Sequence, residues 1–157
     1  MPPEPIVDLS RIDPDKVLVG KEEIRQVNPQ RYEMEQLDGI LYEDREHSVF
    51  VGYKDVREDE FWVRGHIPGR PLLPGVLMIE AAAQLASYYG HRTLKDCPFV
   101  GFGGVDETKF RGTVVPPSRL ILMAKGVEAR PRRVRCYVQG FVDGRMVFET
   151  LITGMPV

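Results

Sequence analysis

One histidine and one glutamate, His66 and Glu80, are the residues of this chain best suited to acid–base chemistry. His66 lies in a stretch rich in glycine and proline, and Glu80 follows fourteen positions later in a stretch that is otherwise apolar. A neutral imidazole can take up a proton near pH 7, and a carboxyl group in apolar surroundings can keep one, because burial raises its pKa. The pair therefore suits a reaction that removes a proton from carbon and expels a hydroxyl group.

The residues between them predict a shaped loop followed by a helix. Pro68, Gly69 and Pro71 do not fit a regular helix or a central strand. No helix breaker then occurs between Gly75 and Gly90, so we expect a helix with Gly75 as its N-cap and Gly90 just beyond its end. The first turn of a helix carries unpaired N–H groups and the positive end of the dipole. The backbone N–H of Gly75 is therefore a candidate donor to a substrate carbonyl oxygen.

Gln84 lies one helical turn after Glu80 and on the same face. We expect it to orient the Glu80 carboxyl group by a hydrogen bond. The helix is apolar on almost every side, which is typical of a buried helix, and two polar residues interrupt it before it reaches the roughly 20 apolar residues of a membrane span. Each residue alone also has an ordinary interpretation: Glu80 as a group that reaches water or a partner, and His66 as a hydrogen-bonded structural residue.

The composition fits one domain with its own core. The chain has 157 residues, with 21 Lys and Arg against 23 Asp and Glu, and this balance argues against a nucleic-acid or membrane-surface role. Cys97 and Cys136 are far apart and match no metal spacing, so we expect reduced core thiols in a cytoplasmic protein. The proline-rich start has no basic or apolar signal region, and we expect residues 1–20 to form a partly flexible tail.

The remaining pattern predicts strands around a single long helix. A short helix is expected at 21–27, and Asp143-Gly144 is a two-residue hairpin signal. Because strands and helix are segregated along the chain, the fold class is α+β with an antiparallel sheet. The expected strands are 35–42, 48–56, 99–110, 120–128, 133–142 and 146–153.

The stretch Gly65–Gln84, GHIPGRPLLPGVLMIEAAAQ, resembles the signature of 3-hydroxyacyl-[acyl-carrier-protein] dehydratases of the FabZ type, GHFPGxPxxPGVLxxEAxAQ, with Ile67 in place of phenylalanine. Residues 99–116 are similar to the strand VGIDxxxFRxPVxPGD of that family, and the resemblance covers about residues 24–153. Two regions depart from the pattern. Residues 30–39 keep little of the usual HRYPFLLVDR, and Pro117-Ser118 replaces Gly-Asp, so the acyl-chain and carrier preferences stay open.

The resemblance implies a single hotdog domain over residues 21–157, in which one long helix is wrapped by the sheet. It also implies dehydration of (3R)-3-hydroxyacyl-[acyl-carrier-protein] to the trans-2-enoyl thioester in fatty-acid biosynthesis, with His66 as base, Glu80 as acid and no metal or cofactor. Relatives that also isomerise the double bond carry aspartate as the acid, so we expect no isomerase activity. The family further implies a homodimer in which His66 of one subunit meets Glu80 of the other, and in some relatives three such dimers form a hexamer.

Other functions remain open from the sequence. A dehydratase of polyketide or specialised lipid synthesis would carry the same signature, and a non-catalytic acyl-binding paralogue would share the fold. Hydrolases of this fold lack the His-x-Pro-Gly loop, and hydratases place Asp and His only a few residues apart, so both fit less well. The basic run around Arg132 and Arg133 is either a solvated turn or a docking patch for the acidic carrier protein.

Overall fold

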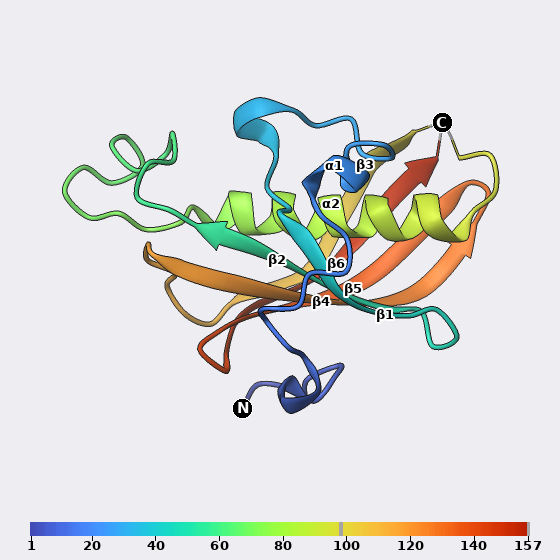
Figure 1. Ribbon diagram of the computed structural model, residues 1–157, viewed down its shortest axis with the longest axis horizontal. Coiled ribbons are helices and arrows are strands. Elements are labelled where there is room, and N and C mark those ends of the chain that lie inside the picture. The colour runs from blue at the N-terminus through green and yellow to red at the C-terminus, as the bar shows by residue number, and fades with distance from the viewer. Residues whose placement is uncertain (98, 157) are drawn as a thin grey trace.

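Six antiparallel strands curl around one long helix (Figure 1). The computed structural model describes residues 1–97 and 99–156. Neighbouring strands in the sheet follow the order β1-β2-β4-β5-β6-β3. The helices are α1 (Lys21–Ile24) and α2 (Gly75–Thr93), with short 3₁₀ turns at Leu9–Arg11 and Tyr32–Met34; the strands are β1 (Gly39–Asp44), β2 (Val49–Val56), β3 (Val100–Phe110), β4 (Ser118–Arg130), β5 (Arg133–Val142) and β6 (Arg145–Pro156).

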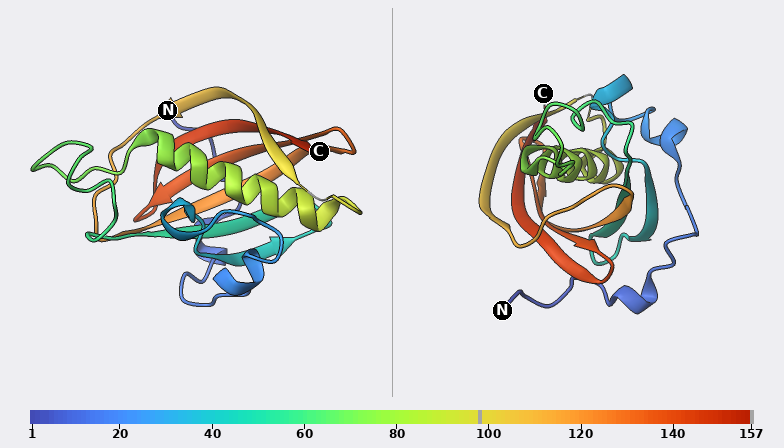
Figure 2. Two further views of the ribbon diagram at one scale, coloured as in Figure 1. Left: turned by 90° about the horizontal axis from the view of Figure 1, so that it is seen from above. Right: turned by 90° about the vertical axis from the view of Figure 1, so that its left-hand side faces the viewer.

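Every neighbouring pair of strands is antiparallel, which confirms the predicted α+β class and the hotdog arrangement. The hairpin between β5 and β6 turns at Asp143 and Gly144, as the sequence predicted. Their φ angles of 49° and 78° give the left-handed pair of a two-residue hairpin turn. Figure 2 shows the curled sheet holding α2 on its concave side.

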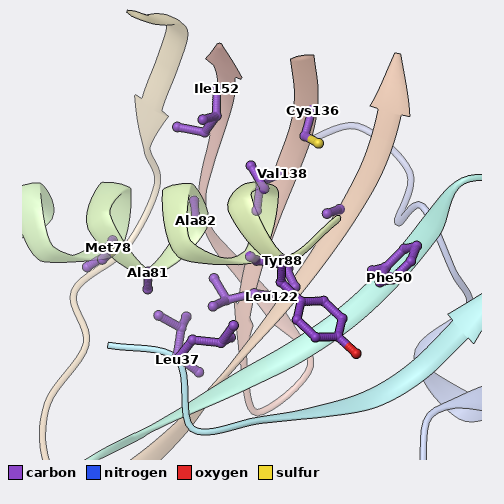
Figure 3. Packing of buried hydrophobic residues seen from close by; sticks show 14 of the residues in the cluster. Leu37, Phe50, Met78, Ala81, Ala82, Tyr88, Leu122, Cys136, Val138 and Ile152 are labelled. Atoms are coloured by element: carbon purple, nitrogen blue, oxygen red, sulfur yellow. The ribbon is translucent and has the colours of Figure 1, made fainter. Parts of the chain in front are cut away.

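The main core fills the space between α2 and the concave face of the sheet (Figure 3). Ala81 and Ala82 present small side chains that are fully buried, so the strands can approach the helix closely. Leu85, Leu122 and Val138 fill the gaps beside them and are also fully buried. Complete burial of a leucine or valine side chain stabilises a fold by about 1.5–3 kcal/mol, so this layer holds α2 firmly in place.

The ends of α2 differ from the prediction at both termini. Pro74 is the N-cap and Gly75 is the first helical residue, and the helix continues through Gly90 to Thr93. Gly90 is buried, and a Cβ atom there would lie 3.4 Å from Cγ2 of Val134. The glycine therefore allows close contact between helix and sheet instead of ending the helix.

Several other predicted boundaries shift. Residues 35–38 are outside β1, because the backbone N–H of Gln36 donates to the side chain of Gln84 and not to a strand. The α-helix predicted at 21–27 is shorter, Lys21–Ile24. Cys136 is buried as expected, whereas Cys97 is only partly buried and is not a core thiol.

The segment before α1 packs on the outer face of the sheet. Val7 and Ile12 are buried there in a second apolar cluster with residues of β1, β2, β4 and β5. Gln139 of β5 pins the segment, because its Oε1 accepts from Ile6 N at 2.8 Å and its Nε2 donates to Glu4 O at 2.9 Å. Residues 6–12 therefore cover apolar surface of the domain, and the domain boundary expected at residue 21 stays a prediction.

The two edge strands of the sheet, β1 and β3, differ in how far other residues cover them. At β1, the backbone of Val19 exchanges hydrogen bonds with Ile40, so part of this edge is covered. At β3, the side chains of Phe102 and Val105 are 52% and 41% exposed. An edge strand with exposed apolar side chains is a ready site for pairing with another chain.

Candidate functional site

His66 lies in the loop 57–74, which connects β2 to α2 and projects beyond the end of the sheet (Figure 1). Its backbone N–H donates to Trp62 O at 2.9 Å, and its Nδ1 lies 2.8 Å from Leu72 O. Because a carbonyl oxygen only accepts, Nδ1 must carry the hydrogen in this contact. The neutral ring then has its lone pair on Nε2, and the imidazole is exposed. His66 is thus set up as a proton acceptor at Nε2.

A buried ion pair anchors the start of this loop. Lys54 Nζ and Glu60 Oε1 are 2.5 Å apart, with side chains only 2% and 6% exposed. Glu60 Oε2 also accepts from the backbone N–H of Arg57 at 2.8 Å. Trp62, two residues later, is buried in the main core. The loop therefore leaves the sheet in a defined direction, although its tip is exposed.

Glu80 lies on α2 beside Gln84, and the predicted hydrogen bond between them is present. Gln84 Nε2 donates to Glu80 Oε1 at 2.7 Å and to Met34 O at 2.7 Å, while Gln84 Oε1 accepts from Gln36 N at 2.9 Å. All the contacts of the amide agree in direction, so its orientation is determined. Glu80 Oε2 is left to carry a proton when the carboxyl group is neutral. The catalytic roles of Glu80 and Gln84 stay predictions.

Gly75 has a packing role beside the predicted chemical one. It opens α2, so its N–H belongs to the first turn, where backbone donors lack partners within the helix. A Cβ atom at this position would lie 2.8 Å from the ring of Phe110 on β3. Glycine therefore lets Phe110 of β3 pack closely against the start of the helix, and the role of the Gly75 N–H toward a substrate carbonyl stays a prediction.

A cavity of about 210 Å³ opens beside Glu80. It lies between α2, the beginnings of β3 and β5 and the end of β6, and both Glu80 and Gln84 line it. Ligand pockets generally measure roughly 300–1,000 Å³, so this cavity in a single chain can hold only part of a large substrate. Among the described residues, the lining includes none from the loop 57–74.

The structure does not join His66 and Glu80 within one chain. In the described part of the chain, the His66 side chain bonds to Leu72 and the Glu80 side chain to Gln84. Figure 2 shows the loop extending away from the body of the domain, beyond the first turn of α2. The two predicted site residues therefore form two half-sites, one exposed and one lining a cavity.

Sequence reasoning missed the residues that support each half. Lys54 and Glu60 give no local signal, because their pairing depends on the loop folding back over β2. Ser87 could have been found, since it continues the spacing of Glu80 and Gln84 along one helix face. Ser87 lines the cavity, and its hydroxyl group donates to Asn28 Oδ1 at 3.0 Å.

The basic run at the turn between β4 and β5 is partly neutralised. Arg133 makes two contacts with Glu128, at 2.7 and 3.1 Å, and this guanidinium holds the pKa of the Glu128 carboxyl below its usual value. Arg132 lies at the tip of the turn and is exposed. Docking of an acidic carrier at this turn stays a prediction, with Arg132 as the better candidate.

Similar solved structures share the fold at low sequence identity. The dehydratase heterocomplex ApeI:P from Xenorhabdus doucetiae matches with a TM-score of 0.71 and 13% identity, covering 85% of this chain and 90% of that chain. A putative thioesterase, a phenylacetic acid degradation-related protein from Ralstonia eutropha JMP134, matches with a TM-score of 0.62 and 13% identity over 74% and 82%. A hypothetical thioesterase with coenzyme A from Streptococcus pneumoniae TIGR4 matches with a TM-score of 0.62 and 10% identity over 87% and 95%.

Neither helix in the described ranges has the length and hydropathy needed to cross a membrane. The match to a protein family is more informative than the structural neighbours, because identities of 10–13% support only a shared fold. Residues 28–151 match the FabA-like domain, and this range includes the loop with His66, the whole of α2 and all strands except the end of β6. The chain therefore belongs to the FabA-like domain family.

Proposed function

We propose that the chain is a 3-hydroxyacyl-[acyl-carrier-protein] dehydratase of the FabZ type, which forms trans-2-enoyl thioesters without isomerising them. The observation that carries the proposal is the carboxyl group of Glu80, oriented by Gln84 at the wall of a cavity. The signature around His66 and the match to the FabA-like domain support the same assignment. The structural neighbours support only the fold, because their identities are low.

His66 is the general base in this proposal. Its Nδ1–H is held by Leu72 O, so Nε2 takes the proton from C2 of the substrate. The C2–H electrons move into the bond between C2 and the thioester carbonyl carbon. The backbone N–H at Gly75, at the positive end of α2, stabilises the negative charge on the carbonyl oxygen.

Glu80 is the general acid. Its Oε1 accepts from Gln84, so the proton leaves from Oε2 to the departing C3 hydroxyl group. The C3–O bond breaks, a double bond forms between C2 and C3, and the hydroxyl group leaves as water. The proton gained by His66 and the proton lost by Glu80 are then exchanged through solvent, which restores both groups.

We also propose that the working site combines two subunits, with the loop of one chain placed over the cavity of the other. Three observations support this: His66 is exposed, the lining of the cavity contains no described residue of the loop, and β3 presents exposed apolar side chains at a sheet edge. Pairing through β3 would bury Phe102 and Val105. The partner in catalysis is an acyl-carrier protein bearing the thioester.

The test is a dehydration assay on (3R)-3-hydroxyacyl thioesters of a carrier protein, with the enoyl product and free thiol measured separately. His66→Ala and Glu80→Gln should each lower kcat by about 10²–10⁴-fold, the usual contribution of one acid–base group. His47→Ala and Glu23→Gln are matched controls on exposed residues and should keep full activity. Wild-type protein that forms no enoyl product, or that only releases free thiol, would contradict the proposal.

A further inference from the structure

A polar stripe runs along α2 from Glu80 into the cavity. It consists of Glu80, Gln84 and Ser87, at positions i, i+4 and i+7 of one helix face, and all three line the cavity beside Ala83 and Ala86. A pocket for a plain alkyl chain needs no polar wall beyond the reacting groups. Ser87, at the far end of the stripe, brings a hydroxyl group to the cavity about two helical turns from Glu80.

Ser87 can only accept a further hydrogen bond. Its Oγ donates to Asn28 Oδ1 at 3.0 Å, and Asn28 Nδ2 donates to Gln84 O at 2.9 Å. The second contact fixes the orientation of the amide, because a backbone carbonyl must receive the NH₂ group. The single hydroxyl hydrogen of Ser87 is therefore committed, and its oxygen can only accept. His91 Nδ1 donates to Ser87 O at 2.9 Å and also lies 3.5 Å from this oxygen, and Ser87 lines the cavity.

Gln30 supplies a second acceptor at the same cavity. It lines the cavity from the segment before β1, and its Oε1 is buried without a hydrogen-bond partner among the described residues. An unpaired buried carbonyl oxygen is uncommon in folded proteins and asks for a donor, from either a ligand or an ordered water molecule. Ser87 and Gln30 can thus both accept a hydrogen bond from a ligand in the cavity.

We propose that the cavity selects 3-hydroxyacyl thioesters whose chain carries a second hydroxyl group several bonds beyond C3, in preference to plain alkyl chains. The inference rests on the proposed function, because it takes Glu80 as the position of the reacting C3. Seven residues separate Glu80 from Ser87, which is about 10 Å along the helix axis. A hydroxyl group can donate its one hydrogen to Gln30 Oε1 or to Ser87 Oγ, whereas a keto group at the same position has no hydrogen to donate.

Binding tests the inference independently of turnover. The probes are unreactive pantetheine thioethers of equal chain length, bearing either no distal group, a keto group or a hydroxyl group that moves outward one carbon at a time. At its best position the hydroxyl probe should bind about 3- to 10-fold more tightly than the other two, the usual worth of one hydrogen bond. Equal binding of all probes, as expected if the acceptors only hold water, would overturn the inference.

Variants test which residues cause the preference for the hydroxyl probe. Ser87→Ala and Gln30→Met should each reduce it, and the double variant should abolish it, while Gln26→Met, an exposed glutamine in the same segment, should preserve it. Gln30→Met keeps the test valid if Ser87→Ala fails to fold, because Gln30 Oε1 has no described partner to lose. A preference that survives in Gln30→Met at full strength would contradict the assigned contact.

Turnover of matched alkyl and hydroxyalkyl substrates separates the two proposals. Dehydration of both at equal kcat/KM, with equal probe binding, would remove the inference and keep the dehydratase. A hydroxyl preference in binding, with no dehydration of either substrate, would remove the dehydratase and keep the specificity of the cavity.

Discussion

The two halves of the candidate site are built in opposite ways. The helix half, Glu80 with Gln84, is enclosed: the Gln84 amide makes three hydrogen bonds, and two of them reach the backbone of residues 34–36. The loop half is open: the His66 side chain makes one bond, to Leu72 of the same loop, and the loop stands away from the sheet. The hydrogen bonds of one chain fix the position of the Glu80 carboxyl group. In the loop half they fix only the start of the loop and the ring nitrogen of His66 that carries the hydrogen.

The difference shows which half needs a partner. An exposed imidazole beside solvent gains little from its surroundings, whereas a base inside a closed site acts in a lower dielectric and at a defined distance. In the proposed dehydratase, we therefore expect the loop half to become catalytic only when a second surface covers it. The exposed apolar edge of β3 is available to bring that surface, and the partly covered edge of β1 is not.

The strongest test of this comparison is complementation between two inactive variants. If His66 of one subunit works with Glu80 of the other, mixing His66→Ala with Glu80→Gln under conditions of subunit exchange should restore activity to about a quarter of the wild-type value. Half of the dimers would be mixed, and each mixed dimer would contain one intact site. Turnover is measured before and after exchange, and two inactive parents that remain inactive together would place both groups in one subunit.

Removing one charge of the buried Lys54–Glu60 pair tests whether this pair anchors the start of the loop. Glu60→Gln leaves Lys54 buried without its counter-charge, so the free energy of unfolding should fall by about 3 kcal/mol. Urea titration measures the change, and Glu23→Gln is an exposed control. The double variant Lys54→Met/Glu60→Leu should recover most of the stability, because no buried charge is left unpaired. If Glu60→Gln is as stable as wild type, the pair does not anchor the loop.

The stability of the protein should depend on pH through Glu35. This residue lies between Met34 and Gln36, whose backbone groups bond to Gln84. The Arg25 guanidinium, 2.7 Å away, holds the pKa of Glu35 below its ordinary value of 4.5. A lowered carboxyl pKa contributes stability above the unfolded pKa, and this contribution is lost as pH falls through the folded pKa. Wild type should therefore be more stable than Glu35→Gln at pH 7, by an amount that shrinks as pH falls below about 4.5.

Urea midpoints of both proteins across this pH range give the measurement. A stability difference that stays constant into acid would show that the pair does not hold the segment through charge. This effect should be the smallest of the three, because Arg25 is one-third exposed and water screens the pair.

Local sequence was enough to predict a large part of the architecture. The apolar run from Gly75 predicted α2, strand-like runs predicted most strands, and Asp143-Gly144 predicted a hairpin that is present. The Gly90 prediction was wrong, because the helix continues to Thr93 and the glycine instead lets Val134 of β5 pack closely against α2. The first predicted strand is present as β1, but its predicted start at residue 35 was wrong, since the backbone N–H of Gln36 bonds to a side chain of α2.

The sequence by itself determined the chemical types at the site and their local setting: an imidazole in a Gly/Pro-rich loop, a carboxyl group on an apolar helix and an amide one turn later. These follow from short-range rules of spacing and propensity. Only the tertiary structure decided what those groups meet. Asn28 meets Gln84 and Ser87 only because the chain folds back on α2, and such contacts between distant segments leave no periodic signal in a single chain. The buried Lys54–Glu60 pair and the separation of His66 from the cavity depend in the same way on the path that the loop takes after β2.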